Sequence, residues 1–202
     1  MSNFVLDRKK YIVLVDLDDT IYPFIPKILE RYNEKYSDNL NISNITDYKI
    51  KNFIKPECEN IFKEFANKSL FDNITLTSDV KDTLSILNNK YNIFFTTSGH
   101  PKTTKHRDKL LSRNLPWYSS SQIISIKYKD FIYADYLIDD CLDNFTEYSM
   151  YRGILKTQPW NLSNPSSNEI RINNFSEVLK VFEEEEYMRK CEMCDYNNLF
   201  ED

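Results

Sequence analysis

Short apolar runs that end in polar residues recur along the chain, and they predict a set of buried strands. We expect strands at residues 11–16, 92–97, 122–126, 136–139 and 152–155. The first two are continuous apolar runs, which is typical of strands buried on both faces of a sheet. Helical stretches lie between the strands, and two of them are expected to start near Ser78 and Ser176. This alternation predicts an α/β fold, a Rossmann-like parallel sheet flanked by helices.

The segment at residues 21–75 departs from the alternation, because it offers amphipathic helical pieces and no convincing buried strand. Two such pieces lie at residues 28–36 and 57–65. A crossover between parallel strands needs only about a dozen residues, so a connection of this length indicates an insert. We therefore expect residues 1–20 and 76–202 to form the core, and residues 21–75 to form a small helical cap above the sheet edge.

Composition and charge narrow the class of protein. The 202 residues are 41% hydrophobic, which is a globular composition, and the formal net charge of −5 argues against a stable nucleic-acid partner. A small anionic substrate remains compatible with that charge. No apolar run approaches the roughly 18 residues of a membrane span, so we expect a soluble cytoplasmic protein without a membrane partner. The sequence also allows a homodimer.

Carboxylates follow two of the expected strands at the point where each strand ends. Asp16, Asp18 and Asp19 end the first strand, and Asp139 and Asp140 end the fourth. Ligands bind at the carboxyl ends of strands in an open parallel sheet, so these acids converge if the two strands are neighbours. Such a cluster repels itself unless a cation lies within it, and Mg²⁺ prefers oxygen ligands that it shares with substrate phosphates. The pattern therefore predicts a magnesium site.

Hydroxyl and amino groups follow the second and third strands. Thr97, Ser98 and Gly99 end the second strand and offer hydroxyl and backbone N–H donors for phosphate oxygens. Lys127 and Lys129 follow the third strand, and either could place an ammonium group at the same edge. A carboxylate nucleophile, a metal ion, hydroxyl donors and a lysine together make a phosphoryl-transfer site.

In their order along the chain, these motifs resemble those of the haloacid dehalogenase (HAD) superfamily. The stretch Asp16-Leu17-Asp18-Asp19-Thr20 is similar to its first motif, Thr97 to its second, Lys129 to its third and Asp139-Asp140 to its fourth. Within the superfamily the chain resembles the 5′(3′)-deoxyribonucleotidases, through the stretches FFTTSGHP, ADYLIDD and LKTQPWN. It departs from that group at Asp19, where many members have glycine, and at Cys141, where a basic residue is frequent.

The resemblance implies a Mg²⁺-dependent phosphomonoesterase that hydrolyses (deoxy)ribonucleoside monophosphates through an aspartyl-phosphate. Asp16 would be the nucleophile and Asp18 the general acid and base. The implied metal ligands are Asp16, the backbone carbonyl of Asp18 and Asp140, with Asp139 assisting. The implied substrate contacts are Thr97, Ser98 and Lys129 for the phosphate and Phe24 for the nucleobase.

Two alternatives stay open beside this interpretation. One is a HAD phosphatase for another small phosphate ester or for a nucleic-acid end, and the other is a non-catalytic HAD-like binding module. Three further expectations concern single residues. Asp19 is expected to face solvent or to cap the next segment, and Trp160 to pack against the sheet edge. His100 and His106 could each contact substrate, but we favour the interpretation that they are ordinary polar residues of their segments.

Overall fold

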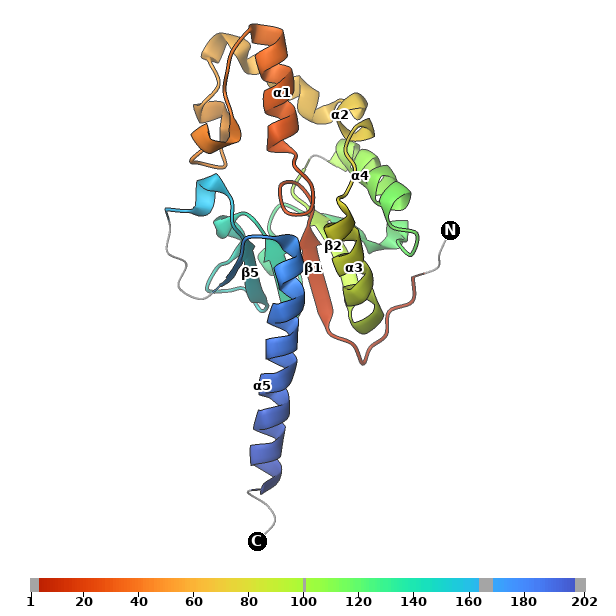
Figure 1. Cartoon of the computed structure of the whole chain (residues 1–202). Helices are drawn as coiled ribbons and strands as arrows, with labels where there is room; N and C mark the ends of the chain where they lie inside the picture. Colours follow the sequence, from red (N-terminus) through yellow and green to blue (C-terminus); the bar gives the residue numbers. More distant parts are fainter. Residues whose placement is uncertain (1–3, 100, 164–168, 199–202) are drawn as a thin grey trace.

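The chain folds around an all-parallel sheet with the strand order β3-β2-β1-β4-β5-β6 (Figure 1). The computed structural model describes residues 4–99, 101–163 and 169–198, so His100 lies outside the described residues. The strands are β1 (Ile12–Asp16), β2 (Asn92–Thr97), β3 (Ile123–Ser125), β4 (Tyr136–Asp139), β5 (Arg152–Lys156) and β6 (Ile170–Ile172). All five expected strands are thereby confirmed, and β6 is an addition that the apolar pattern did not predict.

The central position of β1 explains its apolar sequence. Val13, Leu14 and Val15 have no exposed surface, because apolar clusters cover both faces of the sheet at β1. The strands β2 and β4 pair with β1 on its two sides. Val15 of β1 lies opposite Ile138 of β4 in the parallel register. The strands with the acidic ends are therefore neighbours, and their carboxylates leave the sheet at the same edge.

Five α-helices belong to the described part of the chain, and three of them pack on the sheet. The α-helices are α1 (Ile25–Tyr36), α2 (Lys68–Asp72), α3 (Ser78–Lys90), α4 (Pro101–Asn114) and α5 (Val178–Asn198). Buried residues of α3, α4 and α5 join Val13 and Val15 in one large apolar cluster. A smaller cluster around Leu14 and Leu137 occupies the opposite face. None of the helices in the described part of the chain combines the length and the apolar character that crossing a membrane requires.

3-10 helices supply many of the connections, and one of them shifts an expected helix start. They are η1 (Ile42–Asn44), η2 (Ile50–Asn52), η3 (Pro56–Ala66), η4 (Ser120–Gln122), η5 (Lys129–Phe131), η6 (Leu142–Asn144), η7 (Pro159–Asn161) and η8 (Phe175–Glu177). Helix α3 begins at Ser78, but Thr77 is the residue at its N-cap. Helix α5 begins two residues after Ser176, because η8 precedes it with a capping box between Asn174 and Glu177.

Residues 21–75 hold α1, η1, η2, η3 and α2 and stand above the sheet in Figure 1. Ile28 and Tyr32 of α1 have no exposed surface, and neither has Ile61 of η3. The amphipathic piece expected at residues 57–65 is present as the 3-10 helix η3. The apolar side chains of this segment thus pack at the carboxyl edge of the sheet and continue the large apolar cluster that contains Val13 and Val15.

Candidate active site

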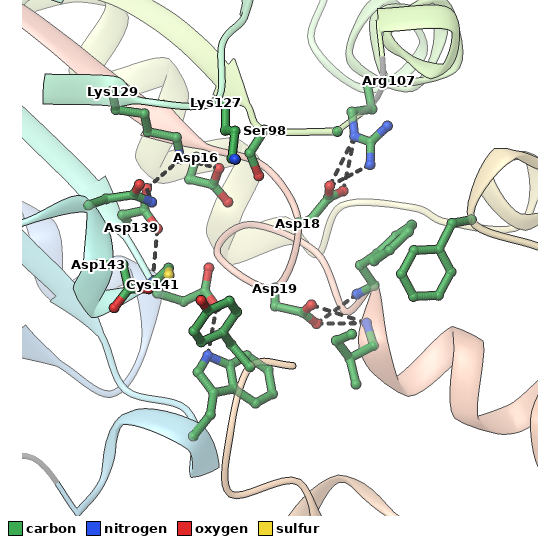
Figure 2. Close-up of a pocket in the computed structure, with 18 of the residues that line it drawn as sticks. Asp16, Asp18, Asp19, Ser98, Arg107, Lys127, Lys129, Asp139, Cys141 and Asp143 are labelled. Atoms are coloured by element: carbon green, nitrogen blue, oxygen red, sulfur yellow. Dashed lines mark hydrogen bonds and ion pairs between the residues drawn. The ribbon is translucent and has the colours of Figure 1, made fainter. Parts of the chain in front are cut away.

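A pocket of about 490 Å³ lies at the carboxyl edge of the sheet, between the strand ends and residues 21–75 (Figure 2). Strand ends and the loops that follow them contribute its charged wall. Its charged lining residues are Asp16, Asp18, Asp19, Arg107, Lys127, Lys129, Asp139, Asp140 and Asp143. The segment above the sheet contributes Phe24, Ile25, Tyr48 and Phe65. The pocket therefore has one highly charged side and one largely aromatic side.

Three buried carboxylates come together on the charged side. One carboxylate oxygen from each of Asp16, Asp139 and Asp140 lies within 4.8 Å of the other two. Among the described residues, these three side chains form a group that could hold a metal ion. Burial raises the pKa of Asp16 well above its ordinary value, while Lys129 lowers it. Burial and then Asp139 raise the pKa of Asp140 in the same way. A hard divalent cation would relieve this repulsion, and an all-oxygen donor set suits Mg²⁺.

Lys129 is the lysine that reaches these acids. Its Nζ atom donates to Asp16 Oδ1 at 2.5 Å and also to Asp139 Oδ2, and only 1% of its side chain is exposed. Burial lowers the pKa of Lys129, but the carboxylates of Asp139 and Asp16 outweigh it and raise the pKa. Lys127 is exposed at the pocket and lies over the ring of Tyr128 at 4.8 Å. The structure thus brings Lys129, and not Lys127, to Asp16.

Asp140 is held by side chains from two other segments. Thr20 Oγ1 donates to Asp140 Oδ1 at 3.0 Å, and Trp160 Nε1 donates to Asp140 Oδ2 at 2.9 Å. Asn161 Nδ2 donates to the Asp140 backbone carbonyl at 2.8 Å. Trp160 is buried, as expected of a residue that packs at the sheet edge, but its indole N–H also orients a carboxylate. The QPWN stretch therefore serves the acidic cluster directly.

Asp18 lies apart from the three clustered acids and pairs with a residue that sequence reasoning missed. Arg107 of α4 donates from Nε to both Asp18 carboxylate oxygens at 3.1 Å. Burial lowers the pKa of Arg107, but Asp18, Tyr22 and Asp16 together outweigh it and raise the pKa. Arg107 follows His106 in a helix rich in basic residues, so no local signal in the sequence singles it out. His106 itself stacks on Phe71 with ring centroids 5.6 Å apart.

The two expected phosphate-binding hydroxyls differ in their positions. Ser98 is exposed and lines the pocket. Thr97 is 1% exposed, and its Oγ1 atom accepts from the Gly99 backbone N–H at 3.1 Å. Thr97 therefore shapes the loop after β2, and Ser98 offers its hydroxyl to the pocket.

Phe24 is part of an aromatic group at the insert side of the pocket. It is 5% exposed, and its ring centroid lies 5.4 Å from that of Phe65 and 5.8 Å from that of Phe71. Tyr48 is half exposed in the same wall, and a hydrogen bond to Asp143 raises the pKa of Tyr48 to about 12. Aromatic surface is therefore available beside the charged wall.

Asp19 caps the next segment, which confirms one of the two expectations for it, and it does not face solvent. Its Oδ1 atom accepts from the backbone N–H groups of Phe24 and Ile25 at 2.9 Å, at the start of α1. Asp19 is 8% exposed, and its φ of 61° lies in the left-handed region. Burial raises the pKa of Asp19, while the hydrogen bond from Ile25 lowers it.

Asp19→Ala is expected to lower the free energy of unfolding by about 1–2 kcal/mol, because two helix N–H groups lose their acceptor. Asp19→Asn keeps an acceptor oxygen, and asparagine tolerates the left-handed region, so its loss should be smaller. Urea unfolding followed by circular dichroism measures both variants. Equal stability of the alanine variant and the wild type would contradict the capping role.

The family of the chain follows from a match that covers most of its length. Residues 10–185 match the family described as 5′ nucleotidase, deoxy (Pyrimidine), cytosolic type C protein. A 5′(3′)-deoxyribonucleotidase from Clostridium acetobutylicum is 30% identical over 135 residues, which are 65% of this chain and 75% of that protein.

Solved structures agree on the fold. A haloacid dehalogenase-like hydrolase from Streptococcus pneumoniae superposes with a TM-score of 0.62 at 13% identity, over 86% of this chain and 98% of that one. A HAD family hydrolase from Deinococcus radiodurans, with bound phosphate and sodium, gives 0.57 at 11% identity, over 88% and 97%. These likenesses confirm the HAD-type Rossmann-like fold, and the sequence match sets aside the non-catalytic alternative. The chain belongs to the 5′(3′)-deoxyribonucleotidase family, has a HAD-like fold and is a phosphatase.

Proposed function

We propose that this phosphatase hydrolyses (deoxy)ribonucleoside monophosphates to nucleoside and phosphate, with Mg²⁺ and an aspartyl-phosphate on Asp16. One observation carries the proposal, namely that Lys129 and the clustered acids converge on Asp16 in the pocket. The name of the Clostridium acetobutylicum relative supports the substrate class.

The chemistry follows from the positions of Asp16 and Asp18. In the first step Asp16 attacks phosphorus, the bond from phosphorus to the nucleoside oxygen breaks, and Asp18 gives that oxygen a proton. In the second step a water molecule attacks phosphorus, Asp18 takes its proton, and the bond to Asp16 breaks. Lys129 holds the Asp16 carboxylate in place for the attack and neutralises charge beside it. Ser98 would donate to a phosphate oxygen from the pocket wall.

The carboxylates of Asp16, Asp139 and Asp140, with the Asp18 backbone carbonyl, would hold the metal ion. When bound, Mg²⁺ would neutralise charge on the phosphate and orient it toward the nucleophile. Thr20 and Trp160 keep Asp140 turned toward the other acids, so the donor set is arranged by the protein itself.

Residues 21–75 would form the cap that closes this site and selects its substrate, with residues 1–20 and 76–202 as the catalytic core. Phe24 and Phe65 line the pocket from the cap side and offer ring surface to a nucleobase. The hydrogen bond from Tyr48 to Asp143 connects the cap to the loop after β4. A substrate with an aromatic base would fill both the charged and the aromatic side of the pocket.

Phosphate release from a panel of phosphate esters tests this proposal. The panel contains the 5′- and 3′-monophosphates of deoxyribonucleosides and ribonucleosides, together with glycerol phosphate and a 5′-phosphorylated oligonucleotide. Each compound is assayed with Mg²⁺ and with EDTA. We expect release that requires Mg²⁺ and is fastest for the nucleoside monophosphates. Release from another ester with none from any nucleotide would leave the family assignment in place and overturn the substrate proposal.

A further inference from the structure

Arg107 belongs to helix α4 and points toward Asp18, which lies in the loop after β1 (Figure 2). Its side chain is 3% exposed. Besides the two contacts from Nε, one of its terminal nitrogens donates to Asp18 Oδ2 at 2.5 Å. The other terminal nitrogen donates to Thr103 Oγ1, one helical turn earlier, at 2.7 Å. The guanidinium group is thus anchored in α4 and presents its remaining donors to Asp18.

The surroundings of Arg107 allow its guanidinium group little freedom. A Cβ atom on Gly99 would lie 3.0 Å from the guanidinium carbon and from both terminal nitrogens, so a larger residue there would press on the guanidinium group. On the insert side, the rings of Phe24 and Phe71 have their centroids 5.5 and 4.9 Å from the guanidinium carbon. A buried arginine packed in this way holds a carboxylate in one orientation through its planar fork.

Asp18 receives one more hydrogen bond and stays open to the pocket. The hydroxyl group of Tyr22 donates to Asp18 Oδ1 at 2.5 Å. The Asp18 side chain nevertheless remains 23% exposed and lines the pocket. Each of the two buried cations therefore pairs with a different acid of the first strand end: Lys129 contacts Asp16, and Arg107 contacts Asp18.

We propose that Arg107, assisted by Tyr22, is a positioning residue that fixes the Asp18 carboxyl group for proton transfer. The inference rests on the proposed function, because Asp18 acts as general acid and base only in that reaction. Proton transfer needs the donor within about 2.6–3.2 Å of its target. A misplacement of about 1 Å can cost about 10²-fold in rate. An Asp18 side chain without the arginine fork would rotate away from the leaving oxygen.

A comparison of two substrates with different leaving groups distinguishes a positioning role of Arg107 from a structural one. The alcohol of a nucleoside is a poor leaving group and needs a proton from Asp18 as its bond to phosphorus breaks. The nitrophenolate of 4-nitrophenyl phosphate leaves without protonation. A misplaced general acid therefore lowers kcat/KM for a nucleotide and affects the nitrophenyl ester much less, whereas a distorted pocket slows both.

Arg107→Met is expected to lower kcat/KM for deoxyuridine 5′-monophosphate by about 10²-fold and that for 4-nitrophenyl phosphate by less than about 5-fold. Arg107→Lys keeps the charge but not the fork, so its loss should fall between those of the wild type and the methionine variant. Tyr22→Phe removes one hydrogen bond and should show a smaller loss with the same substrate dependence. These two milder variants keep the test decisive if Arg107→Met does not fold.

Arg113 offers a matched control on the same helix. It donates to the backbone carbonyls of Phe71 and Ile74, and among the described residues it makes no hydrogen bond or ion pair with Asp18. Arg113→Met should therefore change both substrates by the same factor. In an Asp18→Asn background, Arg107→Met should cause no further loss on the nucleotide, because its effect passes through Asp18.

Equal losses on both substrates in the Arg107 variants would overturn the positioning role. A further loss in the Asp18→Asn background would overturn it as well, because Arg107 would then act on the substrate itself. The wild type serves as the reference for the proposed function. If it released no phosphate from either compound, both the proposed function and this inference would fail, whereas an active wild type with equal losses in the variants would overturn the inference alone.

Discussion

Asp16→Asn is expected to abolish phosphate release from every nucleotide that the wild type hydrolyses. An amide is a far weaker nucleophile than a carboxylate, so turnover should fall by more than about 10⁴-fold. The fold should survive, because Lys129 keeps its contact with Asp139. Colorimetric phosphate release measures the loss, and circular dichroism checks the fold.

Asp143 provides the control for this experiment. It is exposed and lines the same pocket, but it is not one of the three clustered acids. Asparagine keeps an acceptor oxygen for the Tyr48 hydroxyl group, so Asp143→Asn should retain turnover. Activity of Asp16→Asn near the wild-type level would mean that another group attacks phosphorus, and the aspartyl-phosphate on Asp16 would have to be abandoned.

Lys129→Met is expected to lower the free energy of unfolding by about 3–5 kcal/mol, as removal of one partner from a buried ion pair commonly does. The methionine side chain fills similar space but leaves the carboxylates of Asp16 and Asp139 buried without their cation. Turnover should be lost in the same variant. Urea unfolding at about pH 8 without added metal measures the change in stability.

The stability deficit of Lys129→Met should shrink toward acid pH. Burial raises the pKa of Asp16 and Lys129 lowers it, so removal of Lys129 raises that pKa further. A carboxyl group with a raised pKa in the folded state contributes stability that is full below its unfolded pKa and is lost as pH rises through its folded pKa. The deficit should therefore be smaller at about pH 5 than at about pH 8.

Lys127→Met is the matched control, since Lys127 is exposed two residues away. Its effect on stability should stay within about 0.5 kcal/mol at both pH values. A deficit in Lys129→Met that is the same at both pH values would show that the carboxylates do not cause it.

Most of the sheet was predictable, because strands buried on both faces of a parallel sheet have continuous apolar sequences. β1 and β2 read as continuous apolar runs, and all of the expected strands agree with the structure within one residue at each end. β6 (Ile170–Ile172) escaped prediction, because a three-residue edge strand with Arg171 at its centre has no apolar run. The 3-10 type of η3 was not predicted, because a 3-10 helix of 11 residues is uncommon and the sequence indicated only an amphipathic helical piece.

The acids of the site were predictable because topology alone places them. Asp16 and Asp139 end neighbouring strands, so they converge whatever the loops do. The choice between Lys127 and Lys129 needed the structure, because the turn η5 begins at Lys129 and the chain buries that side chain while Lys127 stays exposed. Arg107 could not be found from sequence, since only the packing of α4 against the first loop brings it to Asp18.

The contacts of the site join segments that lie far apart along the chain. Lys129 and Asp16 are 113 residues apart, Thr20 and Asp140 are 120 apart, and Arg107 and Asp18 are 89 apart. Pairings of such long range form late in folding, because loop closure must come first. Recovered turnover is therefore expected to be the last signal to return on refolding. A nascent chain that has passed residue 129 but has not reached residue 140 carries Asp16 and Lys129 but lacks Asp140, so its cluster of acids is incomplete and we expect it to be inactive.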